Sequence, residues 1–411
     1  MLNTMKIKTL FLTAVLFFGP GYFLWACTSA IITGKATPDG RPLMWKHRDT
    51  GTDWNHIAFF RGEKYAFSGL INSDDHTGDV WTGMNEAGFA IMNTASYNLK
   101  DDDVKEMDGE GRLMRLALGV CKDVKDFEHF LDTLSRPMRV EANFGVIDAF
   151  GGAAYYETNN TRYIKRDAND PALAPEGYLI YTNFSFHGRK DEGLGYVRYH
   201  TAEMLFHTFE KEDFTPAVIL SRCSRSFLNS LLGYDLKDDE FSPNRANGFC
   251  VEQDYIPRKE SSASLVIQGV KPGMNPELTT MWTVLGYPPA SVALPVWVKT
   301  AEDIPVLLAA SKETGHAPLC EKAVELEQQI FPVKRGNGKK YIHWKLLYNG
   351  EQIGIMQRIQ AVEDRIFTLF QKKEAEWQRE NRLNPKEVQE LYREATAIIE
   401  KAYQKDFNLR F

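Results

Sequence analysis

The chain has 411 residues, of which 43% are hydrophobic, 12% aromatic and 25% charged. This composition is typical of a folded globular protein, and it excludes disordered, collagenous and coiled-coil chains. The formal net charge of -6 leaves no basic footprint for a phosphate backbone, so we expect no nucleic-acid partner.

The N-terminus has the features of a targeting segment. Two lysines precede an apolar run over 10–18, a Gly/Pro break follows at 19–21, and the small residue Ala26 stands before Cys27. This pattern predicts a signal peptide over 1–26 and export to a periplasmic or secreted location. The run is shorter than the ~20 residues that cross a bilayer, and no later stretch is long and apolar enough, so we expect no membrane span.

A cysteine directly after the predicted cleavage site has two interpretations. Leu24-Trp25-Ala26-Cys27 could be a lipobox, with a lipid anchor on Cys27. The bulky Trp25 is unusual at such a site, and residues 28–33 resemble a strand entering a core, not a flexible tether. The junction alone leaves both interpretations open.

The cysteines give no sign of a structural metal. No CxxC pair and no Cys/His spacing suited to zinc is present, and we expect neither a metal nor another cofactor. In an oxidising compartment four cysteines could pair, and buried free thiols are equally compatible with the spacing. The five are Cys27, Cys121, Cys223, Cys250 and Cys320.

Short strands and a few helices are predicted in chain order. Strands over 27–33 and 42–46 flank the turn signal at 37–40, which predicts a β-hairpin with Cys27 at its free end. Helical spacing covers 112–121, 124–134 and 197–209. Strands mixed with helix pairs predict an α+β layered domain, because no strict βαβ alternation is present. The other predicted strands are 56–61, 80–82, 89–94, 143–148, 153–157, 178–182, 263–267, 281–285 and 291–298.

The tail predicts two amphipathic helices. One carries an apolar stripe whose members are spaced three or four residues apart, and Asn384-Pro385 ends it. We expect the two helices to pack on their own domain, and a partner-binding hairpin is the alternative. The stripes are Ile355, Ile359, Val362, Ile366 and Phe370 on the first helix, and Val388, Leu391, Ala395, Ile398 and Ala402 on the second.

An N-terminal cysteine would carry its own base. Its α-amino group has an ordinary pKa of ~7.7 to 8.0, so it could take the thiol proton directly or through water and later donate it to a leaving amine. Lys46-His47-Arg48-Asp49 follows the second predicted strand, where the hairpin could bring it beside Cys27. A solvated charged turn is the bland alternative, and His47 is the rival base for a Cys/His pair.

Further motifs appear in a consistent order. After the start at 27–50 they are Gly83-Met84-Asn85-Glu86-Ala87-Gly88-Phe89, Asn143-Phe144-Gly145-Val146-Ile147-Asp148-Ala149, Tyr181-Thr182-Asn183 and Tyr196-Val197-Arg198-Tyr199. The start resembles the mature N-terminus of the N-terminal nucleophile (Ntn) hydrolases, in particular the linear-amide group of choloylglycine hydrolases, penicillin V acylases and isopenicillin-N acyltransferase-like proteins. The later motifs are similar to that group's Asn-Glu turn, inner strand, Thr-Asn motif and late-arginine segment.

The resemblance implies a four-layer αββα sandwich with Cys27 as nucleophile. It implies that Asp49 holds the nucleophile's amine, that Asn183 helps stabilise the tetrahedral intermediate, and that Arg198 is the late arginine of the site. Asn93, on the strand after the Asn-Glu turn, would supply oxyanion contacts.

The sequence departs from the family pattern at one cation. The family places arginine three residues before the aspartate, and Lys46 stands there, with Arg48 next to Asp49. Arginine and lysine are not interchangeable where a planar fork is needed, so either residue could be the site cation. Asn183 also lies in a sequon, Asn183-Phe184-Ser185, which gives it a glycosylation alternative.

These observations predict an exported hydrolase that cleaves a linear amide of a small molecule through a Cys27 thioester. We expect an Ntn-hydrolase domain over 27–320 and a helical extension over 321–411. An acyltransferase of the same fold and a lipid-anchored, non-catalytic binding protein are the alternatives. The sequence leaves the substrate and the oligomeric state open.

Overall fold

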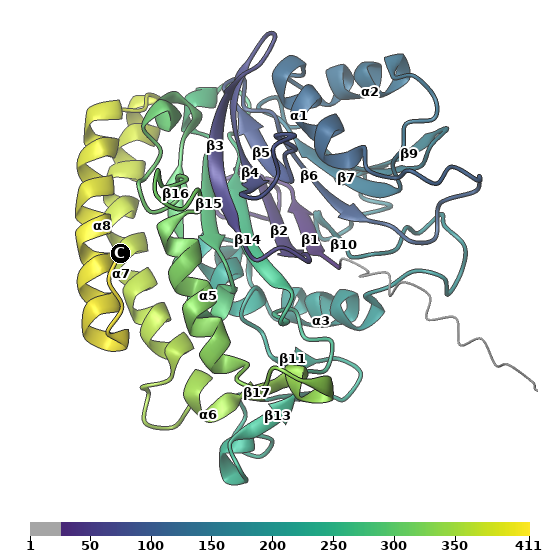
Figure 1. The fold of residues 1–411 in the computed structure, drawn as a ribbon. Helices are drawn as coiled ribbons and strands as arrows, with labels where there is room; N and C mark the ends of the chain where they lie inside the picture. The colour runs from purple at the N-terminus through teal and green to yellow at the C-terminus, as the bar shows by residue number, and fades with distance from the viewer. Residues whose placement is uncertain (1–25) are drawn as a thin grey trace, which may run out of the picture.

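The computed structural model describes residues 26–411, and the predicted signal peptide lies outside these residues except for Ala26. Two large antiparallel sheets, here called sheet A and sheet B, form its centre (Figure 1). In order across the sheet, the strands of sheet A are β10 (Tyr178–Tyr181), β1 (Thr28–Ile32), β2 (Leu43–Asp49), β14 (Ser261–Gln268), β15 (Thr280–Leu285) and β16 (Leu294–Val296).

Sheet B is a meander whose strands pair in chain order. Its strands are β3 (Asn55–Arg61), β4 (Ala66–Asn72), β5 (Thr82–Asn85), β6 (Ala90–Ala95), β7 (Ala142–Ile147), β8 (Ala153–Thr158) and β9 (Tyr163–Asp167). Strands β1 and β2 of sheet A contact β7 of sheet B, and β1 also contacts β8. The two sheets therefore stack face to face.

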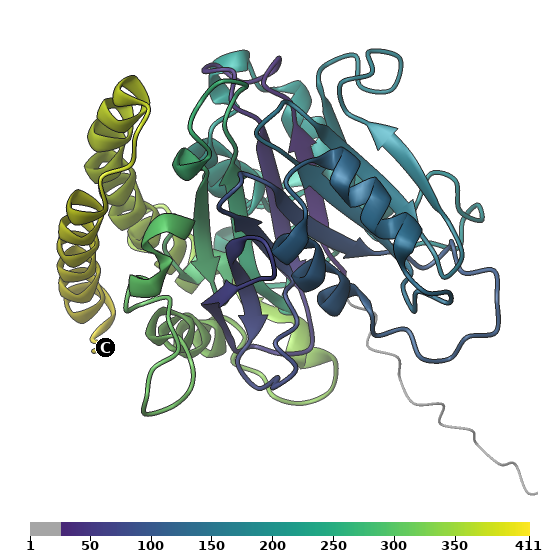
Figure 2. The same ribbon diagram turned by 90° about the horizontal axis from the view of Figure 1, so that it is seen from above.

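Helices cover the outer face of each sheet, as Figures 1 and 2 show. On the side of sheet B lie α1 (Glu110–Val120) and α2 (Val124–Thr133), and on the side of sheet A lie α3 (Tyr196–His207), α5 (Pro318–Ile330), α7 (Ile355–Glu380) and α8 (Pro385–Phe407). This order of layers is the predicted four-layer αββα sandwich with C-terminal helices.

Smaller elements complete the described chain. They are α4 (Pro216–Val218), which continues as one turn of π-helix, α6 (Trp344–Leu347), and the two-stranded sheets β11 (Leu228–Asn229) with β12 (Tyr234–Asp235) and β13 (Phe249–Val251) with β17 (Tyr341–His343). No helix of residues 26–411 combines the length and the apolar character that crossing a bilayer requires.

The predicted N-terminal hairpin is confirmed. Strands β1 and β2 pair antiparallel, with Thr28 opposite His47 and Ser29 opposite Lys46. Gly40 in the connecting turn has φ 77°, a left-handed value that glycine adopts without steric cost. Because side chains alternate along a strand, Ser29 and Lys46 share the face toward sheet B, where Ser29 Oγ lies 2.8 Å from Tyr155 Oη.

Two strands of sheet B were not predicted, β4 and β9. In β4, Gly69 interrupts the apolar pattern and is an ordinary sign of a turn. The structure needs a glycine there, because a Cβ at this position would lie 2.5 Å from Cγ1 of Val80. The expected strand at 80–82 is displaced, and β5 begins at Thr82.

The C-terminal helices lie against sheet A through aromatic contacts. Trp282 of β15 stacks on Phe367 of α7 with 4.0 Å between ring centroids, and Trp297 meets Trp377 edge-on at 5.5 Å. All five predicted stripe residues of α7 are buried. On α8 four of the five predicted stripe residues are buried, while Ile398 is half-buried and its neighbour Ile399 is buried instead.

Candidate active site

Cys27 lies directly before β1, between the ends of two neighbouring strands of sheet A. Its N–H donates to Oδ1 of Asn183 at 2.8 Å, and its carbonyl oxygen accepts from Nη1 of Arg198 at 2.7 Å. Only 7% of Cys27 is exposed, and Ala26 before it is 3% exposed. Both backbone polar groups of the predicted nucleophile are therefore held by predicted site residues.

Asn183 follows β10, the edge strand that pairs with β1. Its Nδ2 donates to the carbonyl of Ala95 at 2.9 Å, and its Oδ1 accepts from Arg198 Nη2 at 3.0 Å as well as from Cys27. The side chain is fully buried, so these bonds fix its orientation.

Arg198 is in the first turn of α3 and is 1% exposed. Besides Cys27 and Asn183, it donates to Thr28 Oγ1 at 3.0 Å and, through Nε, to Asp254 Oδ1 at 3.0 Å. Burial lowers the pKa of this guanidinium, and the positive charge of Arg258 acts in the same direction. The structure thus brings Cys27, Asn183 and Arg198 into direct contact.

Asp49, at the end of β2, lies on the helix-covered face of sheet A. Its Oδ1 accepts from Ser261 Oγ at 2.7 Å, and its Oδ2 accepts from Arg258 Nε at 3.1 Å and Nη2 at 3.0 Å. Burial raises the pKa of this carboxyl to about 6, although Arg258 acts in the opposite direction. In the described residues Asp49 reaches Cys27 through Arg258, Asp254 and Arg198, so a direct bond to the amine stays a prediction for the cleaved chain.

Arg258 and Asp254 are the residues that sequence reasoning missed. Arg258 Nη1 donates to Asp254 Oδ1 at 3.2 Å, which makes Asp254 the link between two arginines. Burial disfavours the charge of Arg258, but the carboxylates of Asp49 and Asp254 outweigh it and raise its pKa. The available signal was the charged run Arg258-Lys259-Glu260 at the start of a predicted core strand.

Lys46 points toward sheet B. Its Nζ donates to the carbonyl of Trp81 at 2.6 Å and to Oδ1 of Asn93 at 2.7 Å, and 1% of the residue is exposed. Burial lowers the pKa of Lys46 to about 7, and the negative charge of a Cys27 thiolate would act in the opposite direction. The structure therefore brings two further predicted residues, Lys46 and Asn93, into direct contact between the two sheets.

Arg48 also interacts electrostatically with Cys27. Burial lowers its pKa to about 10, and a Cys27 thiolate would again oppose the shift. Its guanidinium donates to Asn55 Oδ1 at 2.5 Å and Asn72 Oδ1 at 2.7 Å, and it lies 5.1 Å from the centroid of the Trp81 ring. Arg48 belongs to sheet A, and Asn55 and Asn72 belong to sheet B, so the guanidinium of Arg48 links the two sheets.

His47 lies on the opposite face of β2 from Lys46. Its Nε2 is 2.9 Å from Ser261 Oγ and 3.6 Å from Asp49 Oδ1. Burial, reinforced by Arg198 and Arg258, lowers its pKa to about 3, so the ring is neutral near pH 7 and meets Asp49 through Ser261 rather than as an ion pair. The charged run at 46–49 is a buried strand and not a solvated turn.

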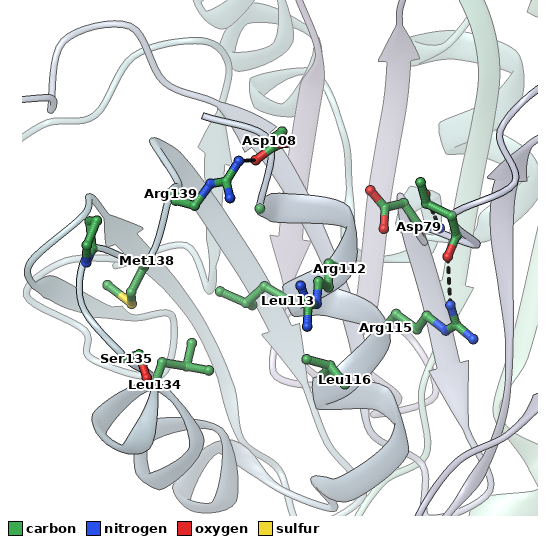
Figure 3. Close-up of a pocket in the computed structure, with 13 residues that line it drawn as sticks. Asp79, Asp108, Arg112, Leu113, Arg115, Leu116, Leu134, Ser135, Met138 and Arg139 are labelled. Atoms are coloured by element: carbon green, nitrogen blue, oxygen red, sulfur yellow. Dashed lines mark hydrogen bonds and ion pairs between the residues drawn. The ribbon is translucent and has the colours of Figure 1, made fainter. Parts of the chain in front are cut away.

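Other described features lie away from this cluster. A cavity of about 760 Å³ opens between α1 and the segment 134–139, lined by Arg112, Arg115 and Arg139 with several leucines (Figure 3). None of the predicted site residues lines it. All five cysteines are free thiols, and residues 26–411 contain no cluster of three side chains that could hold a metal ion.

Comparisons with known proteins return solved structures only. No protein-family model and no curated protein matches the chain. The solved structures include the Caenorhabditis elegans ortholog of N-acylethanolamine-hydrolyzing acid amidase, which is 14% identical, covers 59% of this chain and 92% of that chain, and has a TM-score of 0.39. Penicillin V acylase from Agrobacterium tumefaciens is 13% identical, with coverage of 70% and 89% and a TM-score of 0.39.

A variant of conjugated bile acid hydrolase from Clostridium perfringens is 16% identical, with coverage of 66% and 93% and a TM-score of 0.35. All of these TM-scores are below 0.5, and the layer order of this chain rests on its own strand pairing and contacts. In its motifs the chain resembles the linear-amide hydrolases of the Ntn type.

Proposed function

We propose that the protein is an exported hydrolase of linear amides, with Cys27 as its nucleophile once residues 1–26 are removed. The observation that carries the proposal is the pair of bonds that Asn183 and Arg198 make to the backbone of Cys27. They hold Cys27 at the N-terminal end of β1, near the buried side chains of Lys46 and Arg48. Nearby positive charge is suited to forming and using a thiolate.

Removal of Ala26 would convert the Cys27 N–H into an amine at the same position. Because Asn183 Oδ1 accepts a hydrogen from this nitrogen, the amine is oriented before substrate arrives. The amine takes the thiol proton, and sulfur attacks the amide carbonyl carbon to form a C–S bond and an oxyanion. The oxyanion collapses, the C–N bond breaks, and the proton passes to the leaving amine.

Water then attacks the thioester, releases the acid and restores the thiol. The oxyanion needs buried donors nearby. Lys46 donates to Oδ1 of Asn93, which fixes the other atom of that amide as the NH2 group and a candidate donor. An acyltransferase would differ only in the nucleophile that resolves the thioester.

Burial of the junction supports the enzyme over a lipid-anchored binding protein. Ala26 and Cys27 are 3% and 7% exposed, and a diacylglyceryl group on this thiol would have to displace packed neighbours. His47 lies on the face of β2 that points away from Lys46 and sheet B, where it contacts Ser261. This placement also supports the α-amino group as the base over a Cys/His pair.

The test starts with the N-terminal sequence and intact mass of protein purified from its export route. We expect an unmodified chain that begins at Cys27. This protein is then assayed for amine release from a conjugated bile acid, penicillin V and an N-acylethanolamine, with Cys27→Ala as the matched inactive variant.

Chains that retain residues before Cys27 provide the control for the base. They should be inactive, since their Cys27 nitrogen is a peptide. A lipid on Cys27, or turnover by Cys27→Ala, would overturn the proposal. Full activity of an N-terminally extended chain would instead favour the Cys/His alternative.

A further inference from the structure

Glu157 is a buried carboxylate on the inner face of sheet B. It is 2% exposed and belongs to β8, two residues after Tyr155, whose hydroxyl meets Ser29 of sheet A. The alternation of side chains along β8 therefore directs Glu157 into the space between the sheets. A buried ionised carboxylate requires hydrogen-bond donors on both oxygens.

The donors all come from the chain segment around Asn183. Oε1 accepts from Tyr181 Oη at 2.8 Å and from the Phe186 N–H at 2.9 Å. Oε2 accepts from the His187 N–H at 3.0 Å and from His187 Nδ1 at 2.8 Å. One carboxylate thus binds the chain two residues before Asn183 and again three and four residues after it.

We propose that Glu157 is a positioning residue that holds Asn183 against Cys27 by fixing the segment 181–187, here called the Asn183 segment. The role rests on the proposed function, in which Asn183 orients the Cys27 nitrogen. A displacement of about 1 Å at a catalytic group can cost on the order of 100-fold in rate. The carboxylate suits this task because it accepts at both oxygens, which a neutral amide does not.

Neutral side chains hold the middle of the Asn183 segment. Ser185 donates through Oγ to Asn143 Oδ1 at 2.5 Å and through its backbone N–H to Asn98 Oδ1 at 2.9 Å. At the C-terminal end, the Phe186 and His187 N–H groups bond to Glu157, whereas Tyr181 at the other end is also held by the pairing of β10 with β1. Loss of the charge of Glu157 should therefore loosen the end at 186–187 first and shift Asn183 with it.

The decisive variant is Glu157→Gln, which keeps the shape but turns one acceptor into an NH2 group facing other donors. The matched control is Glu128→Gln, because Glu128 accepts from Tyr156 Oη at 2.9 Å on the outer face of the same sheet. We expect Glu157→Gln to lower kcat about 10- to 100-fold with little change in KM, and the control to leave both near wild type.

Hydrogen exchange gives a readout that does not depend on any substrate. In Glu157→Gln the amides of Phe186 and His187 should exchange faster, and Cys27, held at 7% exposure in the wild type, should react faster with iodoacetamide. The fully buried Cys223 serves as the internal reference for alkylation. These measurements test the positioning role even if the wild type turns over none of the amides assayed.

Two outcomes would overturn the proposal. Unchanged exchange in Glu157→Gln would show that the carboxylate does not hold the Asn183 segment. Faster exchange with unchanged kcat, or with unchanged Cys27 alkylation where no turnover is found, would show that the segment does not position the site. If Glu157→Gln does not fold, Tyr181→Phe removes one of the four donors and should shift the same readouts in the same direction.

Discussion

Oδ1 of Asn183 accepts both the N–H of Cys27, at 2.8 Å, and a guanidinium N–H of Arg198, at 3.0 Å. One amide oxygen thus joins the predicted nucleophile to a buried cation. The positive charge of Arg198 polarises this amide and also holds the Cys27 carbonyl at 2.7 Å. The geometry around residue 27 therefore depends on a few charge-assisted bonds.

Asn183→Ala should lower turnover about 100- to 1,000-fold, a loss typical of removing a donor or orienting group at a reacting centre. The variant also leaves two buried donors unpaired, which costs about 1 to 3 kcal/mol of stability. Steady-state kinetics and chemical denaturation measure the two effects. Asn160→Ala, at a fully buried asparagine bonded to Asp102, is the control and should lose stability without losing kcat. Equal kcat losses in both variants would contradict the role of Asn183.

Arg258→Ala should destabilise the fold by about 3 to 5 kcal/mol at pH 8, because it leaves the fully buried carboxylate of Asp49 without its cation. The loss should be smaller at pH 5. Burial already raises the pKa of Asp49 to about 6, and removal of Arg258 raises it further, so at low pH the folded protein holds the extra proton. Urea denaturation at the two pH values measures this difference. Adding Asp49→Asn should recover part of the loss at pH 8, and a purely additive double variant would argue against the ion pair.

Lys46→Met should change the pH dependence of stability in a defined window. The folded-state pKa of Lys46 is lowered to about 7 from an ordinary 10.5, so between these values the folded protein binds fewer protons than the unfolded chain. Wild-type stability relative to the variant should therefore rise with pH from about 7 to 10, by up to about 1.4 kcal/mol per pH unit, and this contribution is lost as pH falls through 7. Paired denaturation curves across this range measure it. A constant difference would mean that Lys46 keeps its ordinary pKa.

Glu363→Ala should lower the free energy of unfolding by about 3 to 5 kcal/mol, because it leaves Arg225 as an unpaired charge in the core between α7 and sheet A. The two side chains are 0% and 1% exposed, and Nη1 and Nη2 of Arg225 each donate to one oxygen of Glu363 at 2.7 Å. The partly exposed pair of Lys373 and Glu387, at 3.0 Å, links α7 to α8 and is the control. Lys373→Ala should have a much smaller effect, and equal losses from the two variants would contradict the importance of burial.

The elements were largely predictable because their signals are local. The hairpin of β1 and β2 follows from two apolar runs around a Pro-Asp-Gly turn, and the stripe on α7 follows from helical spacing alone. The strand β4 was missed because a buried glycine that makes room for Val80 looks like a turn in sequence. Local patterns give no information on which neighbour a glycine accommodates.

The candidate site was predictable only in part. The family resemblance and the order of motifs along the chain singled out Cys27, Lys46, Asp49, Asn93, Asn183 and Arg198. The structure places Arg198 in α3, Asp49 on the helix-covered face of sheet A, and Lys46 and Asn93 in contact between the two sheets. Which face of β2 each residue occupies depends on strand register, which separates Lys46 from His47 and Asp49. As a result Lys46 contacts Asn93 of sheet B, whereas Asp49 contacts Ser261 and Arg258 on the other face of sheet A.

The sequence by itself determined that strands and helices form a layered α+β domain and that a cysteine stands at the start of the first core strand. Only the tertiary structure decided the electrostatics. It buried the run 46–49 in the middle of sheet A and brought Arg258 from 209 residues along the chain to Asp49. It also placed Asp254 beside Arg198 and Glu157 against the segment that carries Asn183. These are contacts between distant segments, and their strength comes from the exclusion of water between two stacked sheets, a property that no local stretch of sequence has.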